Sequence, residues 1–204
     1  MSLIVENILD MVEDMGEEEV LQDFDSFSSP MNPEIEQFLK HNAIIFAQKK
    51  MSVTYIISDE EDGNILGYFT LANKALEFSK DAVSKGIAKK AERFGTLDES
   101  AGTFTVQSYL LAQFGKNYAV DDGKRVNASD LMEQVNRTIA MIQHMIGGGF
   151  IYLDVEKTMN PGSSDEKPYE KLIDIYRNKA GYAKFRERHS PSDGKDYIMM
   201  IKSV

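Results

Sequence analysis

The sequence predicts a mixed α/β fold in which a central, mostly antiparallel sheet carries helices on both faces. Runs of β-branched and aromatic residues alternate along the chain with stretches of helical spacing. Two of these runs flank a short acidic turn, and a later one is followed by a polar loop and a long helix, an order typical of a mixed sheet. At 204 residues and 42% apolar composition, the chain is long enough for one sizeable core.

The N-terminal segment is expected to be helical and acidic. Apolar residues recur at helical spacing over 3–15, and a second short helix is predicted over 17–24. We therefore expect an acidic helical extension over 1–23 and a folded domain over 24–204. The start of the chain lacks a basic region and an unbroken apolar run, so it matches neither a signal peptide nor a membrane span, and a cytoplasmic protein is expected.

The remaining elements follow from periodicity and from turn residues. A helix is predicted to begin near Pro33, a residue favoured in the first helical turn, and to end at the basic pair Lys49 and Lys50. Predicted strands cover 52–58, 65–72, 103–115, 150–156, 181–188 and 195–203. Further predicted helices cover 80–95, 129–146 and 169–178, and the glycines at 147–149 end the second of these.

The net charge of −10 is unevenly distributed. Residues 1–39 contain 11 Asp and Glu and no Lys or Arg, so the rest of the chain holds 22 acids and all 23 bases. An acidic surface repels nucleic acid, which makes a nucleic-acid partner unfavourable near the N-terminus, whereas tRNA stays open for the near-neutral remainder. A solvated helical face explains the acidic run, and a lid or partner-binding arm is the alternative.

The composition restricts the available chemistry. The chain has no cysteine, which excludes disulfides, thiolate nucleophiles and Cys-ligated metal. Its three histidines, His41, His144 and His189, show no metal-ligand spacing, so no metal is expected. Any reaction must use oxygen, amine or backbone groups.

The polar loop "KNYAVDDGKRVN" over 116–127 is a candidate anion site. A strand that ends in such a loop and enters a helix is where α/β proteins bind phosphates, because the free amides of the first helical turn and the helix dipole favour an anion. The candidate residues are Gly123, Lys124, Arg125, Val126, Asn127, Ala128 and Ser129. The alternative is that Asn127 or Ser129 simply caps the helix.

Three stretches resemble the GCN5-related N-acetyltransferase (GNAT) family. "ILGYFTLA" is similar to its third strand, "LLAQFGKN" to its fourth strand, and "KLIDIYRNKAGYAKF" to its closing pattern of an aliphatic residue, a tyrosine and a Gly-aromatic pair. The resemblance covers about residues 24–204 in the order of elements. It implies a GNAT-like acyl-CoA N-acyltransferase fold with acetyl-CoA as co-substrate.

The resemblance also assigns roles to residues. Tyr176 matches the family tyrosine near the sulfur of coenzyme A, and is our candidate general acid. The oxyanion contact falls on a backbone amide at Phe114, Gly115 or Lys116, where the fourth strand diverges from its neighbour. On periodicity alone, Tyr176 is better explained as a core residue of its helix, and the Gly-aromatic continuation brings the functional interpretation level with that one.

The anion loop departs from the family pattern, Gln/Arg-x-x-Gly-x-Gly/Ala. Ala128 matches the last position, but Val126 replaces the middle glycine and Gly123 the first polar residue. The segment 160–168 is a long insert that moves any asparagine away from its usual distance to Tyr176, so no asparagine is assigned a role.

The general base stays open between Asp154, Glu156 and a water relay. Lys85, Lys89 and Lys90 either meet an anionic substrate or the 3′-phosphate of the cofactor, or form a solvated helical face.

We therefore predict transfer of an acetyl group from acetyl-CoA to a primary amine of a small molecule or a protein. Toxin-like acetylation of aminoacyl-tRNA is one alternative. A catalytically inactive interaction module of the same fold is another, because the loop pattern is eroded. No membrane partner is expected, and a homodimer stays open.

Overall fold

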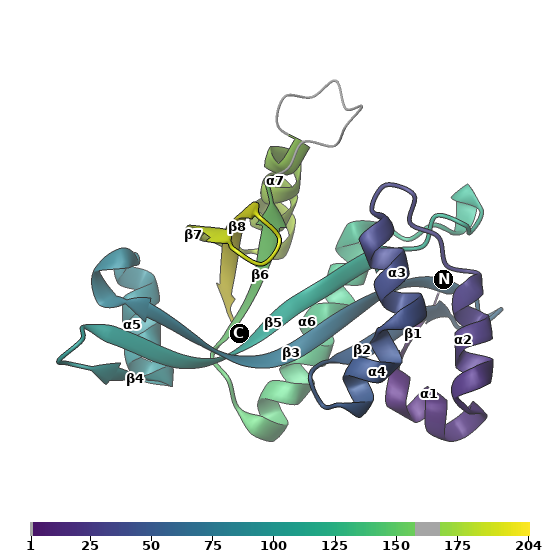
Figure 1. The fold of residues 1–204 in the computed structure, drawn as a ribbon, viewed down its shortest axis with the longest axis horizontal. Coiled ribbons are helices and arrows are strands. Elements are labelled where there is room, and N and C mark those ends of the chain that lie inside the picture. Colours follow the sequence, from purple (N-terminus) through teal and green to yellow (C-terminus); the bar gives the residue numbers. More distant parts are fainter. Residues whose placement is uncertain (1, 158–167) are drawn as a thin grey trace. The chain divides into compact units, whose positions relative to one another are not determined.

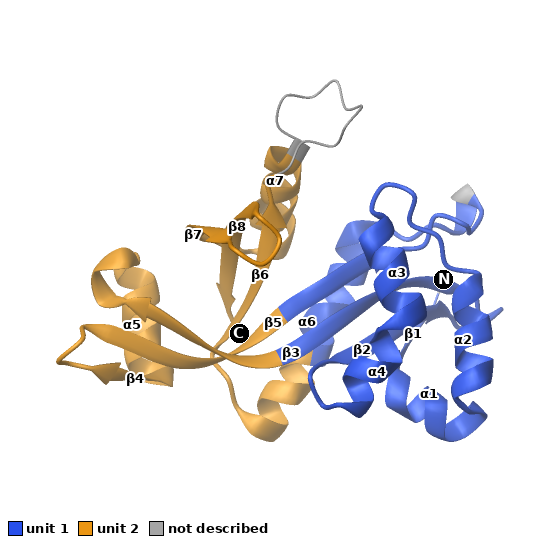
Figure 2. Ribbon diagram, viewed as in Figure 1, with its two compact units in different colours: residues 1–72, 111–138 blue, residues 73–110, 139–204 orange. Residues whose placement is uncertain are grey.

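A computed structural model describes residues 2–157 and 168–204 (Figure 1). The predicted insert over 160–168 therefore lies almost entirely outside the described residues. The chain divides into two compact units, each built from two segments, and each unit is considered by itself (Figure 2). Unit 1 comprises 1–72 and 111–138, and unit 2 comprises 73–110 and 139–204.

The strands form one mixed sheet in the order β1-β2-β3-β5-β6-β8-β7, with β4 paired to β5. Their bounds are β1 Leu3–Asn7, β2 Val53–Asp59, β3 Ile65–Ser79, β4 Gly95–Asp98, β5 Thr103–Lys116, β6 Phe150–Glu156, β7 Ala183–Ser190 and β8 Lys195–Ser203. The pair β5 and β6 is parallel and short, running from Ser108 with Phe150 to Leu110 with Tyr152. The predicted sheet, mixed but mostly antiparallel, is confirmed.

Helices connect and cover the strands. They are α1 Ile8–Met15, α2 Glu17–Asp25, α3 Pro33–His41, α4 Ala43–Gln48, α5 Lys85–Phe94, α6 Ala128–Ile146 and α7 Pro168–Ala180, with 3-10 turns η1 Lys80–Ala82 and η2 Asp122–Lys124. Pro33 stands at the first turn of α3, as predicted. The single helix predicted from there to Lys50 is instead two helices, which meet at Asn42.

Unit 1 is built around the N-terminal half of the chain. The prediction of a helix from residue 3 is wrong for Leu3–Asn7, which forms β1 and pairs antiparallel with β2. The core of this unit includes Ile8, Val20 and Phe24 from α1 and α2, together with residues of α4, β2 and β3. The proposed boundary between 1–23 and 24–204 stays a prediction, although the first segment supplies both a strand and core residues to unit 1.

Unit 2 contains the second half of β3, the first half of β5, and the elements from β6 onward. Its core joins aromatic residues of β3, β5 and β6 to Met199 and Ile201 of β8. The short strand β4 was not predicted, and it extends the β5 ladder between Gly95 and Asp98. At the end of α6, Gly147 and Gly148 adopt left-handed conformations, as expected for a helix stop.

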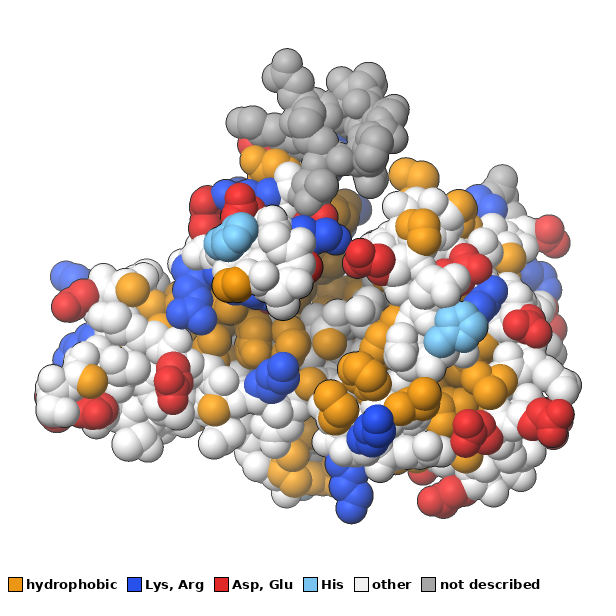
Figure 3. Space-filling model, in the orientation of Figure 1, with side chains coloured by type: hydrophobic (Ala, Val, Ile, Leu, Met, Phe, Trp, Pro, Cys, Tyr) orange, Lys and Arg blue, Asp and Glu red, His pale blue; other side chains and the backbone are white. Residues whose placement is uncertain are grey.

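The two units differ sharply in charge. Unit 1 contains 19 Asp and Glu against 7 Lys and Arg, a net charge of −12, whereas unit 2 contains 14 against 16, a net charge of +2. Figure 3 shows acidic side chains over the region of α1 and α2. The acidity predicted for residues 1–39 therefore belongs to a whole compact unit.

Candidate functional site

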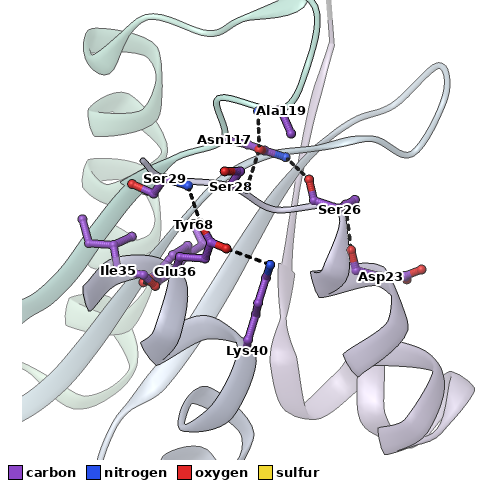
Figure 4. Close-up of polar contacts among 10 residues, drawn as sticks. All are labelled: Asp23, Ser26, Ser28, Ser29, Ile35, Glu36, Lys40, Tyr68, Asn117 and Ala119. Atoms are coloured by element: carbon purple, nitrogen blue, oxygen red, sulfur yellow. Dashed lines mark hydrogen bonds and ion pairs between the residues drawn. The ribbon is translucent and has the colours of Figure 1, made fainter. Parts of the chain in front are cut away.

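The end of β5 is fixed by Asn117, whose side chain is 1% exposed (Figure 4). Its Oδ1 accepts hydrogen bonds from the amides of Ser28 at 3.0 Å and Ala119 at 2.9 Å. Its Nδ2 donates to the carbonyls of Ile65 at 2.8 Å and Ser26 at 3.3 Å. One amide side chain thus joins the β5 end, the start of β3 and the chain between α2 and α3, which determines where the polar loop begins.

The helix α3 is anchored beside this network (Figure 4). Glu36 accepts the amide of Ser29 at 2.8 Å and pairs with Lys40 at 3.0 Å. These contacts lower the pKa of the Glu36 carboxyl, the Ser29 amide contributing most. The hydroxyl of Tyr68, from β3, donates to the carbonyl of Ile35 at 2.6 Å.

The three residues predicted for oxyanion contact are the last three residues of β5, directly before Asn117. Gly115 is buried, and Phe114 and Lys116 are half-buried. A β-carbon at Gly115 would lie 2.4 Å from Cγ2 of Ile35 and 2.9 Å from Cε1 of Tyr68. Close packing against α3 is therefore enough to require this glycine, whatever its amide does.

The cations of the predicted anion loop both have partners within unit 1. Lys124 pairs with Asp62, which raises the pKa of its ammonium group. Arg125 donates to the carbonyls of Val120 at 3.1 Å and Tyr118 at 2.8 Å. Arg125 thereby holds the loop backbone in shape, and Lys124 ties it to the turn between β2 and β3. A hollow of about 210 Å³ lies beside them, lined by residues that include Asn64, Asn117 and Lys124.

The start of α6 presents an exposed edge. Asn127, Ala128 and Ser129 are exposed, whereas Val126 is buried, with 4% of its surface exposed. The carbonyl of Asn127 accepts the amides of Asp130 at 3.0 Å and Leu131 at 3.2 Å. Helix geometry leaves the amides of Ala128 and Ser129 without an intrahelical acceptor. Because Val126 is buried, it does not fill the space outside this turn.

One carboxylate at this turn disfavours the binding of an anion. Asp130 stands in the first turn of α6 and accepts the amide of Asn127 through Oδ2 at 3.3 Å. The interaction caps the helix, as a carboxylate in the first turn commonly does. It also places one negative charge beside the two free amides.

Tyr176 lies on α7 in unit 2 and is half-buried. Its ring meets the ring of Tyr182 edge to face, with centroids 6.0 Å apart, and burial raises the pKa of Tyr176 to about 12. Gly181 follows α7 in a left-handed conformation, and the amide of Tyr182 donates to the carbonyl of Tyr176 at 3.0 Å. The Gly-Tyr pair of the closing motif therefore folds back on Tyr176.

Two candidate bases on β6 are engaged in ion pairs. Glu156 pairs with Lys195 at 2.9 Å. Asp154 accepts Nε and Nη2 of Arg188 at 3.2 and 2.7 Å through Oδ2 alone. Its Oδ1 is buried and has no hydrogen-bond partner among the described residues. Asp154 lines a hollow of about 520 Å³ in unit 2 together with Arg186, Arg188 and Lys74.

Sequence reasoning missed Asn117 and the basic residues of the unit 2 hollow. The position of Asn117 directly after the longest predicted strand is a signal of loop anchoring, but no pattern marks its four partners. Arg186 and Arg188 stand two apart in a predicted strand, a spacing that places both on one face. This spacing could have predicted a basic face on that strand.

The described residues, 2–157 and 168–204, contain neither a metal-ion cluster nor a membrane-spanning helix. No group of three or more His, Cys, Asp or Glu among them is arranged to hold a metal ion. None of their helices is both long and apolar enough to cross a membrane.

Comparison with known proteins identifies the fold. No protein-family model matches the sequence, and neither does any curated protein. Among solved structures, AtaT complexed with acetyl-methionyl-tRNAfMet is similar at a TM-score of 0.60 and 14% identity, over 99% of this chain and 95% of that one. A tyrosine-to-phenylalanine mutant of KacT is similar at 0.61 and 14%, over 100% and 95%. AtaTR bound with acetyl-CoA is similar at 0.56 and 12%, over 98% and 92%.

These likenesses span nearly the full length of both chains. They confirm that this chain has the GNAT-like fold predicted from its three motifs. At such low identity they show the fold alone, and the assignment of individual residues rests on the motifs and the geometry above.

Proposed function

We propose that this protein transfers an acetyl group from acetyl-CoA to a primary amine. The observation that carries the proposal is the fold, which the chain shares over 98% of its length with AtaTR bound with acetyl-CoA. The closing tyrosine motif of α7 supports the same conclusion, because Tyr176 and the Gly-Tyr pair are in contact.

The residues available for the co-substrate fit a diphosphate in part. The exposed amides of Ala128 and Ser129 at the start of α6 would hold it, and the buried side chain of Val126 leaves their outer side open. Lys124 and Arg125 add positive charge near the loop, although both also serve contacts within unit 1. Asp130, beside the two amides, and Asp121, in the same loop, are unfavourable charges.

Acetyl-CoA, when bound, supplies a thioester carbonyl that a neutral amine can attack directly. We assign the backbone amide at Phe114, Gly115 or Lys116 to the oxyanion, where a fixed donor contributes about 3 kcal/mol in other enzymes. We assign Tyr176 to protonation of the departing sulfur. Because its pKa is raised to about 12, its phenol stays protonated at neutral pH and can act as a donor.

Calorimetric titration with coenzyme A tests the proposal. A ligand that binds only the native state raises its apparent stability by about 2.7 kcal/mol at a hundredfold excess over Kd, so a higher melting temperature should accompany binding. Absence of both effects at millimolar coenzyme A would favour the inactive interaction module.

A Tyr176→Phe variant tests the assigned acid. It should bind coenzyme A as the parent does and lose acetyl transfer by about a hundredfold or more, the usual contribution of a general acid. The Tyr55→Phe variant is the matched control, because it also removes one phenol but lies on β2, outside both α7 and the anion loop. Unchanged turnover in Tyr176→Phe would remove the assignment and leave the binding result standing.

A second acceptor, aminoacyl-tRNA, is favoured by the charge of α5. Lys85, Lys89 and Arg93 are exposed, stand one helical turn apart and have no carboxylate partner among the described residues. Lys85 opens the helix, where a cation opposes the dipole, and the first turn holds no acid. These cations are spaced about 6 Å apart along the helix. The charge at the start of this row does not stabilise the helix, but the row suits binding to the phosphates of a nucleic-acid backbone.

Filter binding of charged tRNA at several salt concentrations tests this acceptor. A Lys85→Gln/Lys89→Gln variant should weaken binding and reduce the salt slope by about 2, one for each lost phosphate contact. Lys49→Gln/Lys50→Gln in unit 1 removes the same charge from exposed positions and should leave the slope unchanged. An equal salt dependence of binding in the parent and in both double variants would remove tRNA from the proposal.

A further inference from the structure

The hollow in unit 2 lies on one face of the strands β6, β8 and β7. Sheet register places Asp154 opposite Met199, and Met199 opposite Arg186, so these three side chains form one row across three strands. Tyr152 and Leu110, which are paired in register, extend the lining toward β5. Lys74 and Glu77 of β3 complete the rim of this space of about 520 Å³.

A β-bulge directs two arginines to this face. Lys184 pairs with Met200 and Arg186 with Met199, so Phe185 is an extra residue in β7. Strict alternation would have placed Arg186 on the face of Lys184. The bulge instead puts Arg186 and Arg188 in register with Met199 and Tyr197, and bulges commonly re-aim side chains next to functional sites.

The charges in the hollow are incompletely paired. Arg188 is held by Asp154, which raises the pKa of its guanidinium group. Lys74 and Arg186 have no carboxylate partner among the described residues, and Arg186 reaches only the carbonyl of Glu77 at 3.3 Å. In the described part of the chain, Glu77 is the one carboxylate on this rim and pairs with neither cation, so the two unpaired cations favour an anionic group.

Asp154 offers a hydrogen-bond acceptor for a positively charged group. Its Oδ1 is buried without a partner, an arrangement that is costly unless a donor completes it. The side chain is 17% exposed, and its terminal torsion is soft, so rotation can turn either oxygen toward the hollow. An ammonium group beside the row would provide the missing donor.

We propose that this hollow binds an amine that carries a phosphate or carboxylate close to its amino nitrogen, and that this amine is the acetyl acceptor. Lys74 and Arg186 bind the anionic group, and Asp154 accepts a hydrogen bond from the amino group. The acceptor role rests on the proposed function, whereas the binding site does not. A small phosphorylated amine and a free amino acid share this chemistry.

Calorimetry without acetyl-CoA tests the site with three probes. O-phosphoethanolamine carries both groups, whereas ethanolamine and inorganic phosphate carry one each. We expect the two-group probe to bind at least about tenfold more tightly than either fragment, since each charge-assisted contact contributes that much. Equal affinities for all three would overturn the proposal.

Three variants locate the binding. Arg186→Gln should weaken the binding of phosphoethanolamine and of phosphate about tenfold and leave the binding of ethanolamine unchanged. For the two fragments, Asp154→Asn should do the opposite: it should weaken the binding of ethanolamine and leave that of phosphate unchanged. Lys49→Gln in unit 1 removes an exposed cation outside the hollow and is the matched control. Because Arg186 is exposed and has no ion pair among the described residues, its variant remains informative if Asp154→Asn fails to fold. Loss of affinity in Lys49→Gln equal to that in Arg186→Gln would contradict the site.

The two proposals can fail separately. Selective probe binding in a protein that acetylates no amine would remove the enzymatic function and keep the site. Acetylation of amines by Arg186→Gln with parental KM would remove the acceptor role of the hollow. Displacement of phosphoethanolamine by aminoacyl-tRNA, but not by deacylated tRNA, would assign the amine to nucleic acid, and displacement by amino acids alone would assign it to small molecules.

Discussion

Asn117 combines burial with full hydrogen bonding, which makes it the residue on which the shape of the loop depends. Replacement by alanine would leave two amides and two carbonyls without these partners, at a position that is itself buried. Each lost bond costs about 1 kcal/mol, so we expect Asn117→Ala, which loses four, to lower the free energy of unfolding by about 4 kcal/mol. Urea unfolding followed by circular dichroism would measure this change.

The exposed Asn42→Ala variant is the control for that measurement. Asn42 also precedes a helix, but its side chain makes no capping hydrogen bond. Its replacement should change the free energy of unfolding by less than about 0.5 kcal/mol. Similar losses in both variants would mean that the four contacts of Asn117 contribute little.

Elements were predictable where one face of a segment is buried along its whole length. The alternating and apolar runs of β2, β5 and β6 identified those strands within a few residues. In β1, the spacing of Leu3, Ile4 and Ile8 also fits a helix, and only the partner strand β2 decides between them. The short β4 is mostly polar and forms through its pairing with β5, so no local sequence pattern predicts it.

The candidate site was less predictable than the fold, for a physical reason. Motif spacing located the start of α6 and Tyr176, because these depend on local sequence. It did not show that Val126 faces inward, that Lys124 pairs with Asp62, or that a bulge at Phe185 turns Arg186 to another face. Each of these depends on contacts between residues far apart in the chain.

The approach of α3 to β5 gives a prediction at the scale of elements. A methyl group at Gly115 would overlap Ile35 and Tyr68, and overpacking of this kind costs about 1–3 kcal/mol. We expect Gly115→Ala to be destabilising by that amount in thermal unfolding. Adding Ile35→Ala removes the nearest atom, so the double variant should lose less than the sum of the two single variants.

Additive losses would contradict this account of Gly115. They would show that the backbone moves instead of the side chains colliding. The overlap with Ile35 would then not explain the glycine at position 115.

At the scale of the whole molecule, tyrosine burial predicts how stability depends on alkaline pH. Burial raises the pKa of seven phenols, and the values for Tyr176 and Tyr197 are about 12. The others are Tyr55, Tyr68, Tyr109, Tyr152 and Tyr182. Above pH 10 the unfolded chain releases protons that the folded chain retains, so the stabilisation is complete below pH 10 and is lost as the pH rises toward the folded values.

Tyr182 provides the sharpest test of this dependence. Its hydroxyl is buried and has no hydrogen-bond partner among the described residues, so Tyr182→Phe removes an ionisable group without breaking a bond seen in the structure. At pH 7 the variant should be as stable as the parent or more so. Above pH 10 its stability should fall less steeply, by up to about 1.4 kcal/mol per pH unit. Thermal melts between pH 7 and 11.5, read with tyrosinate absorbance in a chain that has no tryptophan, would measure both effects. An unchanged slope would mean that Tyr182 ionises while the fold is intact, and that unit 2 opens to water around it before it unfolds.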